Sequence, residues 1–118
     1  AAKFVQDNRH AALLALQAFS YRVRKYIGAY VAALGGLDVL IFTGGIGQGS
    51  AAVRSLATQG LGCMGIALDV RRNLEARGFD EICKISTDDS PATVLVVPTD
   101  EEQRIARETL RAIGRSQS

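Results

Sequence analysis

The alternation of apolar and polar positions in the first third of the chain predicts a helix followed by a strand. Between residues 9 and 34, apolar residues recur at spacings of three and four, which predicts one long amphipathic helix. Gly35 and Gly36 follow and supply a residue that can adopt the left-handed conformation at the helix end. Residues 39–42 form an unbroken apolar run, which is typical of a strand covered on both faces.

Shorter elements are predicted in the middle of the chain. Ser50 can cap a helix that ends near residue 57, with Arg54 pointing outward. Periodicity leaves residues 66–68 open between a short strand and a turn, and residues 69–79 open between a short helix and a loop.

The last third of the chain predicts a hairpin and a helix. Residues 82–85 and 93–97 are strand candidates separated by turn-forming residues, so we expect them to pair. A last helix is predicted from about residue 99 to residue 113, and residues 114–118 form a polar tail. Because helices and strands intermix without a linker or repeat, we expect residues 1–118 to form a single α/β unit.

Composition excludes several classes of partner. The 118 residues are 47% hydrophobic, which suits one domain. The 14 basic and 12 acidic residues leave a formal net charge of +2, so we expect no nucleic-acid partner. No apolar run is long enough to span a membrane, and no signal peptide is recognisable, so a soluble protein without a membrane partner is expected.

The sequence has few cysteine and histidine residues that could form a zinc site or a redox motif. Cys63 and Cys83 lie twenty positions apart, and His10 is the only histidine in the sequence. Neither zinc-ligand spacing nor a paired-cysteine motif is present, which fits a reduced, cytoplasmic setting. We assign His10 no role.

A glycine-rich loop follows the apolar run and is the most informative part of the sequence. Four glycines within six positions let the backbone approach another molecule closely, and a following helix would direct free N–H groups to the same place. Since two glycines normally suffice for a turn, we favour a ligand loop over a plain connection. The loop residues are Gly44, Gly45, Ile46, Gly47, Gln48 and Gly49.

Known phosphate-loop patterns fit this loop poorly. No lysine follows the last glycine, so it is not a Walker A motif. Gly47, Gly49 and Ala52 match the dinucleotide fingerprint formally, and Asp69 stands at the distance of a ribose acceptor. The long helix before the strand is not the opening of a dinucleotide-binding unit, so this match is weak.

Three consecutive carboxylates mark the start of the last helix. Thr99 and Glu102 have capping-box spacing, and acidic residues in a first turn stabilise a helix dipole. The other interpretation places one carboxylate near a hard cation such as Mg²⁺. The residues alone favour the cap.

Taken together, four separated segments resemble the C-terminal part of the acetate kinase family, of which propionate kinase is a close relative. These are residues 21–30, residues 37–47, Ser50 with Arg54, and residues 98–102 with Ile105 and Ala106. The resemblance implies part of an actin-like, ribonuclease H-like ATPase fold, with a mixed sheet and flanking helices. It also implies a kinase that transfers the γ-phosphoryl of ATP reversibly to acetate, giving acetyl phosphate and ADP.

The resemblance also implies site residues. It assigns Gly44 to Gly49, Ile46 and Gln48 included, to ATP/ADP binding on the adenosine side, and Glu101 to the Mg²⁺ site. Gln48 and Gly49 stand where the family has glutamate and asparagine, and Asp100 stands where it has asparagine. These differences change the charge and the side-chain amides at both places.

The phosphoryl-holding residues of the family precede the matched part, so the resemblance names no catalytic residue here. We therefore expect the isolated chain to be inactive, and its substrate, acetate or another short-chain acid, to bind elsewhere. Homodimer formation is implied for the full enzyme. The alternative is a non-catalytic assembly module whose long helix presents an apolar patch; on that helix we expect Tyr21, Tyr26 and Tyr30 to be packing groups. A dinucleotide-binding fragment is a more remote possibility.

Overall fold

A computed structural model describes residues 2–44, 50–77 and 81–117, with backbone alone at 2–7, 101, 102, 105 and 113–117. Helices and strands alternate in an α/β arrangement with a mixed three-stranded sheet, as expected. The elements run in the order α1 (Ala2–Leu34), β1 (Val39–Thr43), α3 (Ala51–Thr58), η1 (Leu61–Met64), α4 (Val70–Glu75), β2 (Cys83–Lys84), β3 (Thr93–Val97) and α5 (Thr99–Gln117).

The sheet has the strand order β1-β3-β2. β1 pairs in parallel with β3, in a register that runs from Val39 opposite Thr93 to Thr43 opposite Val97. β2 pairs antiparallel with β3, which confirms the predicted hairpin. The parallel pair joins two strands that are far apart in sequence, so β3 holds the two halves of the chain together.

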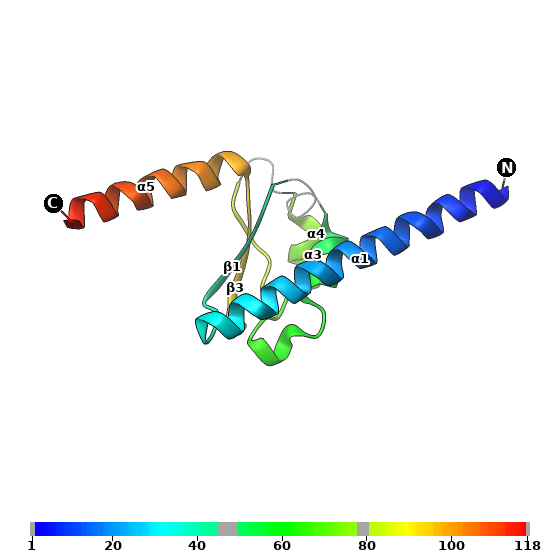
Figure 1. Cartoon of the computed structure of the whole chain (residues 1–118), viewed down its shortest axis with the longest axis horizontal. Coiled ribbons are helices and arrows are strands. Elements are labelled where there is room, and N and C mark those ends of the chain that lie inside the picture. Colours follow the sequence, from blue (N-terminus) through cyan, green and yellow to red (C-terminus); the bar gives the residue numbers. More distant parts are fainter. Residues whose placement is uncertain (1, 45–49, 78–80, 118) are drawn as a thin grey trace.

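One face of the sheet carries the core. Phe42, Val94 and Val96 from this face pack with Ile27 of α1 and Ala57 of α3. Figure 1 shows α1 crossing the sheet, with α3 beside it. Both Val94 and Val96 are 0% exposed, so the centre of the sheet is closed to solvent on this face.

The opposite face of β1 is open, which corrects one expectation. Val39 and Ile41 are 47% and 46% exposed, although the apolar run predicted a strand covered on both faces. The two helices α1 and α3 lie against the other face, and β1 is an edge strand of the described sheet. The run predicted the strand itself correctly.

Helix α1 is longer than predicted and only partly covered. It begins at Ala2 rather than near residue 9, and Gly35 ends it with a left-handed φ of 77°, as expected. Tyr21, Tyr26 and Tyr30 are 53%, 65% and 66% exposed, so the expectation that they are packing groups is wrong for the described part of the chain.

The remaining elements follow the local signals closely. Residues 66–68 contribute a single bridge, between Leu68 and Ser86, rather than a strand. Residues 69–79 include the short helix α4, and α5 continues through Gln117, along most of the polar tail. No helix in the described ranges is both long and apolar enough to cross a bilayer.

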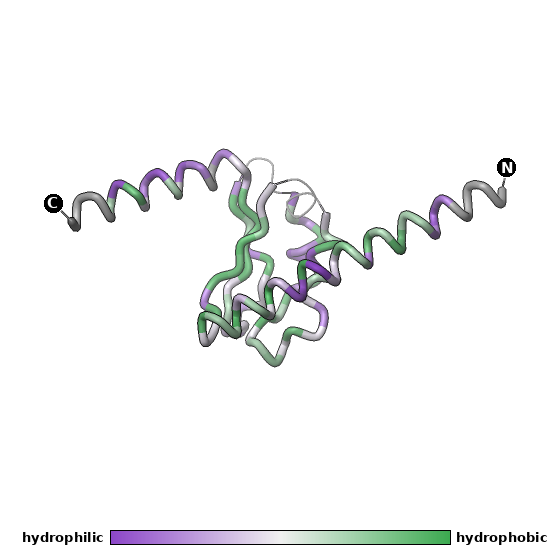
Figure 2. The backbone as a smooth tube through the Cα atoms, viewed as in Figure 1, coloured by the Kyte–Doolittle hydropathy of each residue, from purple (hydrophilic) through white to green (hydrophobic). Residues whose placement is uncertain are grey.

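The molecule is elongated because two helices project from its centre. Its principal extents are 66 × 31 × 25 Å. The first half of α1 extends in one direction and α5 in the other (Figure 1). Hydrophobic residues continue along α1 well beyond the sheet, whereas α5 is mostly hydrophilic with isolated apolar positions (Figure 2).

Candidate functional site

The carboxyl ends of β1 and β3 meet at one edge of the sheet. Thr43 and Val97, the last residues of the two strands, are paired in parallel register. Gly44 directly follows Thr43, and α5 begins at Thr99, two positions after Val97. In sheets with parallel strands, ligands bind outside the carboxyl ends. The pairing therefore brings the start of the glycine loop and the first turn of α5 to the usual place for a ligand (Figure 1).

Gly44 has the backbone conformation that the loop prediction requires. Its φ is +69°, in the left-handed region that favours glycine, and among the described residues no atom outside its chain neighbours lies within 4 Å of where its Cβ would be. The other predicted loop residues lie outside the described residues, and their roles stay predictions. They are Gly45, Ile46, Gly47, Gln48 and Gly49.

The far end of the loop enters a capped helix, as predicted. Ser50 has an extended backbone, with φ −122° and ψ 107°, and its Oγ accepts a hydrogen bond from the Val53 N–H at 3.2 Å. α3 then runs for 8 residues. The cap satisfies one of the free N–H groups of the first turn.

A cavity of about 370 Å³ opens beside Gly44. Most of its lining is apolar and comes from the middle of α1, the end of β1 and the start of α3. The lining residues are Phe19, Val23, Ile41, Phe42, Thr43, Gly44 and Val53. A concave, mostly apolar lining is typical of a small-molecule site.

Glu101, the predicted magnesium residue, lies in the first turn of α5. Its side chain is not described, so its role stays a prediction. Asp100 beside it is exposed, and the capping pair of Thr99 and Glu102 also remains a prediction. Among the side chains that the structure describes, no group of three or more histidine, cysteine, aspartate or glutamate residues could hold a metal. A cation at this edge would thus need Glu101, water or groups from beyond this set.

Arg54 corrects the sequence analysis most clearly. It is 0% exposed rather than outward-pointing. Its Nε donates to Asn73 Oδ1 at 2.8 Å, and one terminal nitrogen donates to the backbone oxygens of Asn73 and Ala76 at 2.9 and 2.8 Å. Burial lowers the pKa of the guanidinium from its ordinary value. Carbonyls at the end of α4 draw the cation inward, because they need donors there.

The sequence analysis overlooked Asn73 as a partner of Arg54. Asn73 is 5% exposed, and its Nδ2 also donates to the Ala51 oxygen at 3.0 Å. A weak signal was present, because the small residue Ala57 and the short Thr58 mark the buried face of α3 that also includes Arg54. The identity of the partner could not have been read from spacing.

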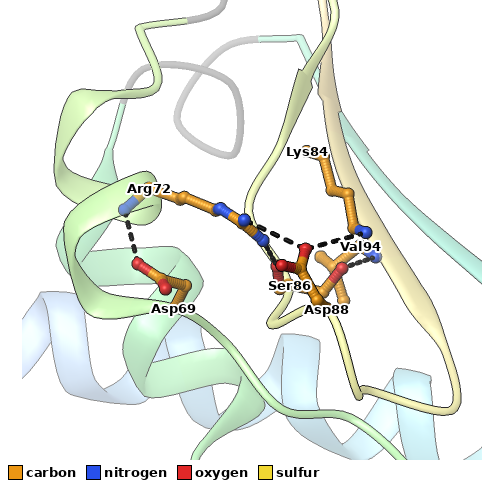
Figure 3. Close-up of polar contacts among 6 residues, drawn as sticks. All are labelled: Asp69, Arg72, Lys84, Ser86, Asp88 and Val94. Atoms are coloured by element: carbon orange, nitrogen blue, oxygen red, sulfur yellow. Dashed lines mark hydrogen bonds and ion pairs between the residues drawn. The ribbon is translucent and has the colours of Figure 1, made fainter.

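Asp69 and Arg72 have structural roles (Figure 3). Asp69 Oδ1 accepts from the Arg72 N–H at 2.9 Å and caps α4, which is a structural role for this carboxylate. The Arg72 guanidinium donates to the backbone oxygen of Ser86 at 2.6 Å and lies 3.0 Å from Asp88 Oδ1. Lys84 Nζ lies 3.6 Å from the same oxygen. These contacts tie α4 to the β2–β3 hairpin.

Comparison with known proteins gives a consistent result. The sequence profile of the acetokinase family matches residues 1–107. The acetate kinase of Syntrophobacter fumaroxidans is 49% identical over 110 residues, which are 93% of this chain and 26% of that protein. The acetate kinase of Dictyoglomus thermophilum is 55% identical over 102 residues, 86% of this chain and 25% of that protein. The chain thus spans about a quarter of the length of these relatives.

Solved structures agree with the sequence match. The acetate kinase of Porphyromonas gingivalis superposes with a TM-score of 0.76 at 40% identity, over 95% of this chain and 28% of that one. The acetate kinase of Entamoeba histolytica gives a TM-score of 0.70 at 31% identity, over 82% and 25%. The fold, the sequence and the family profile all lead to the conclusion that this chain belongs to the acetokinase family.

Proposed function

We propose that this chain is the nucleotide-side, C-terminal part of an acetate kinase, which transfers the γ-phosphoryl of ATP reversibly to acetate and gives acetyl phosphate and ADP. The observation that carries the proposal is the meeting of the β1 and β3 carboxyl ends, with Gly44 after one strand and α5 after the other. Family membership supplies the reaction, and this edge supplies a place where a nucleotide could bind.

In this proposal the glycine loop receives the adenosine part of the nucleotide. The neighbouring cavity of about 370 Å³ is apolar enough for a flat base, and Gly44 lies on its rim. A residue without a side chain at Gly44 lets the backbone approach the ligand. The described residues therefore fit the adenosine end of ATP or ADP better than its phosphates.

Glu101 is the proposed magnesium residue, acting directly or through water. Its position in the first turn of α5, at the same edge as Gly44, supports this role. When bound, Mg²⁺ neutralises charge on the nucleotide phosphates. We assign no catalytic residue to this chain, since the groups that hold the transferring phosphoryl and the short-chain acid belong to the rest of the enzyme. The chain alone is expected not to turn over.

Ligand-induced stabilisation tests the proposal. A ligand that binds only the folded state raises the thermal midpoint, so Mg·ATP and Mg·ADP should raise it while NAD should not. Gly44→Val should abolish this shift, because the added side chain occupies the approach to the cavity. A shift with NAD alone would support the dinucleotide-binding alternative instead.

Gly35→Val is a matched control for this test. Gly35 has a φ of +77° and nothing within 4 Å of its Cβ position, so the substitution imposes similar backbone strain at the far end of β1. The nucleotide shift should survive in this variant. If Gly44→Val and Gly35→Val both retain the shift, the glycine loop is not the site.

An assembly role is the second candidate, and a specific surface favours it. Tyr26, Tyr30 and Leu34 follow one another at single-turn spacing on α1 and are 65%, 66% and 73% exposed. Such an apolar stripe is suited to a second copy of the chain, in line with the homodimer implied for the full enzyme. Concentration-dependent dimers in analytical ultracentrifugation that disappear in Tyr30→Glu, without any nucleotide shift, would favour this function over the first.

A further inference from the structure

The buried guanidinium of Arg54 joins two helices at a point close to the proposed nucleotide loop. Arg54 lies in α3, whose first residue, Ala51, comes directly after the Ser50 cap and the glycine loop. Its hydrogen-bonding partners Asn73 and Ala76 belong to the last turn and the C-cap of α4. The contact therefore connects the helix after the loop to a neighbour that is distant in sequence.

Asn73 completes a closed set of hydrogen bonds. It accepts from Arg54 Nε through Oδ1 at 2.8 Å and donates through Nδ2 to the Ala51 oxygen at 3.0 Å. Residues of α4 and its C-cap thus hydrogen-bond to α3 at two positions, in the first turn at Ala51 and one turn later at Arg54. Both Arg54 and Asn73 are almost wholly buried, at 0% and 5% exposure, so water competes little for these bonds.

Because α3 is short, these hydrogen bonds are important for holding it in position. A helix of 8 residues is marginal by itself, and its position depends on its contacts with the rest of the fold. The opposite end of α3 has a separate contact, in which an Arg24 terminal nitrogen donates to the backbone oxygen of Gln59 at 3.3 Å. Arg24 contacts the C-terminal end of α3, whereas Arg54 and Asn73 act on its N-terminal half, which follows the loop.

We propose that Arg54 is a positioning residue, which through Asn73 fixes the first turn of α3 and with it Ser50, the described residue that follows the proposed nucleotide loop. This inference rests on the proposed function for its ligand. Arg54 itself lies too deep to touch the ligand and acts on the loop through α3. The planar fork of the guanidinium matters more than its charge, because its Nε and a terminal nitrogen serve three acceptors at once.

Arg54→Lys tests the proposal, since it keeps the charge and removes the fork. Hydrogen exchange is followed by NMR at the Val53 amide, in the first turn of α3, and at the Ile85 amide, which donates to the Val94 oxygen at 2.9 Å. We expect exchange at Val53 to rise by about tenfold relative to Ile85, because hydrogen bonds to a charged group are lost at that end of α3. Affinity for Mg·ADP, measured by calorimetry, should fall by about tenfold in the same variant.

Arg24→Lys is the matched control. It weakens the other end of α3, so exchange should change near Gln59 while Val53 and the affinity for Mg·ADP stay as in the wild type. An unchanged Val53 rate in Arg54→Lys overturns the inference, as does an equal rise at Val53 and Ile85, which would mean a loss of global stability only. A raised Val53 rate with unchanged Mg·ADP affinity also overturns it.

The proposed function fails separately, if the wild-type chain does not bind Mg·ADP. The exchange rates then still decide whether Arg54 positions the first turn of α3. A second variant, Arg54→Met, removes the charge as well as the fork. If it unfolds the chain, Arg54→Lys decides the test, because lysine retains the aliphatic stem and the positive charge.

Discussion

The centre of the molecule and its two projecting helices contain similar apolar residues in opposite surroundings. In the centre, Ile85, Val94 and Val96 are all 0% exposed. On the projecting helices, Leu13 of α1 and Leu110 of α5 are 49% and 68% exposed. Every described side chain from Thr99 to Ala112 in α5 is exposed, and Figure 2 shows the hydrophobic residues of α1 continuing beyond the sheet.

This difference separates what the chain stabilises by itself from what it presents to other groups. Apolar burial is the main favourable term in folding, so the centre should carry almost all of the stability. Uncovered apolar positions at helical spacing are typical of a packing or interaction surface. The chain spans about a quarter of the length of its relatives.

A pair of isoleucines gives the largest test of the comparison. Ile85 is 0% exposed and Ile82, three positions earlier, is 45% exposed. Ile85→Ala should lower the free energy of unfolding by about 2–5 kcal/mol, because it removes buried carbons and leaves a cavity. Ile82→Ala should cost less than about 1 kcal/mol. Urea denaturation measures both, and equal losses would mean that the centre does not carry the stability.

Two glycines provide a smaller test of the same kind. Gly65 has a φ of +82° and would place a Cβ 3.1 Å from Pro91 Cβ, whereas Gly35, with a φ of +77°, has open space around it. Gly35→Ala should cost about 1 kcal/mol through backbone strain alone. Gly65→Ala should cost about 1 kcal/mol more, because the added Cβ would crowd the Pro91 ring, which must shift. Thermal unfolding of the two variants would contradict this if Gly35→Ala proved the more damaging.

Sequence reasoning succeeded where the cause of a structure is local. Ser50 and the residues after it predicted a capped helix, and turn-forming residues predicted the β2–β3 hairpin. It failed for Arg54, since the burial of that residue depends on carbonyls of α4, which spacing along α3 cannot reveal. It also failed for the exposure of Ile41, because an apolar run says nothing about which neighbours are present.

At the candidate site, too, local features could be predicted from the sequence and features that depend on distant contacts could not. The need for glycine at Gly44 could be predicted, because its left-handed φ is a local property. The nearness of Gly44 to the start of α5 could not be derived from periodicity, since it depends on the parallel pairing of β1 with β3. The magnesium role predicted for Glu101 came from resemblance to the family, whereas the residues alone favoured a helix cap, with Thr99 and Glu102 as the capping pair.

Acid titration tests the rim of the centre, where Asp88 meets Arg72. Arg72 first, and Lys84 after it, hold the pKa of the Asp88 carboxyl below its ordinary 3.8. A carboxyl with a lowered pKa in the folded state stabilises the fold above its ordinary pKa and loses that contribution as the pH falls below it. Asp88→Asn should therefore reduce the loss of stability below about pH 4, by a small amount because the Asp88 side chain is 81% exposed. The thermal midpoint is measured for both proteins at several pH values between 2 and 6. If it falls by the same amount with pH in the wild type and in Asp88→Asn, the ion pair does not contribute to stability.

The smallest change in stability is expected for a substitution in α5. Leu110→Ala removes a side chain that is 68% exposed, so the free energy of unfolding should change by less than about 0.5 kcal/mol. Backbone amides of α5 should exchange much faster than those of β3, because tertiary packing rather than propensity stabilises most helices. A large loss of stability in Leu110→Ala would mean that α5 packs against another surface in solution, a second copy of the chain included. Repeating the measurement at tenfold dilution distinguishes packing within one chain from packing between two copies, since only packing between copies weakens with dilution.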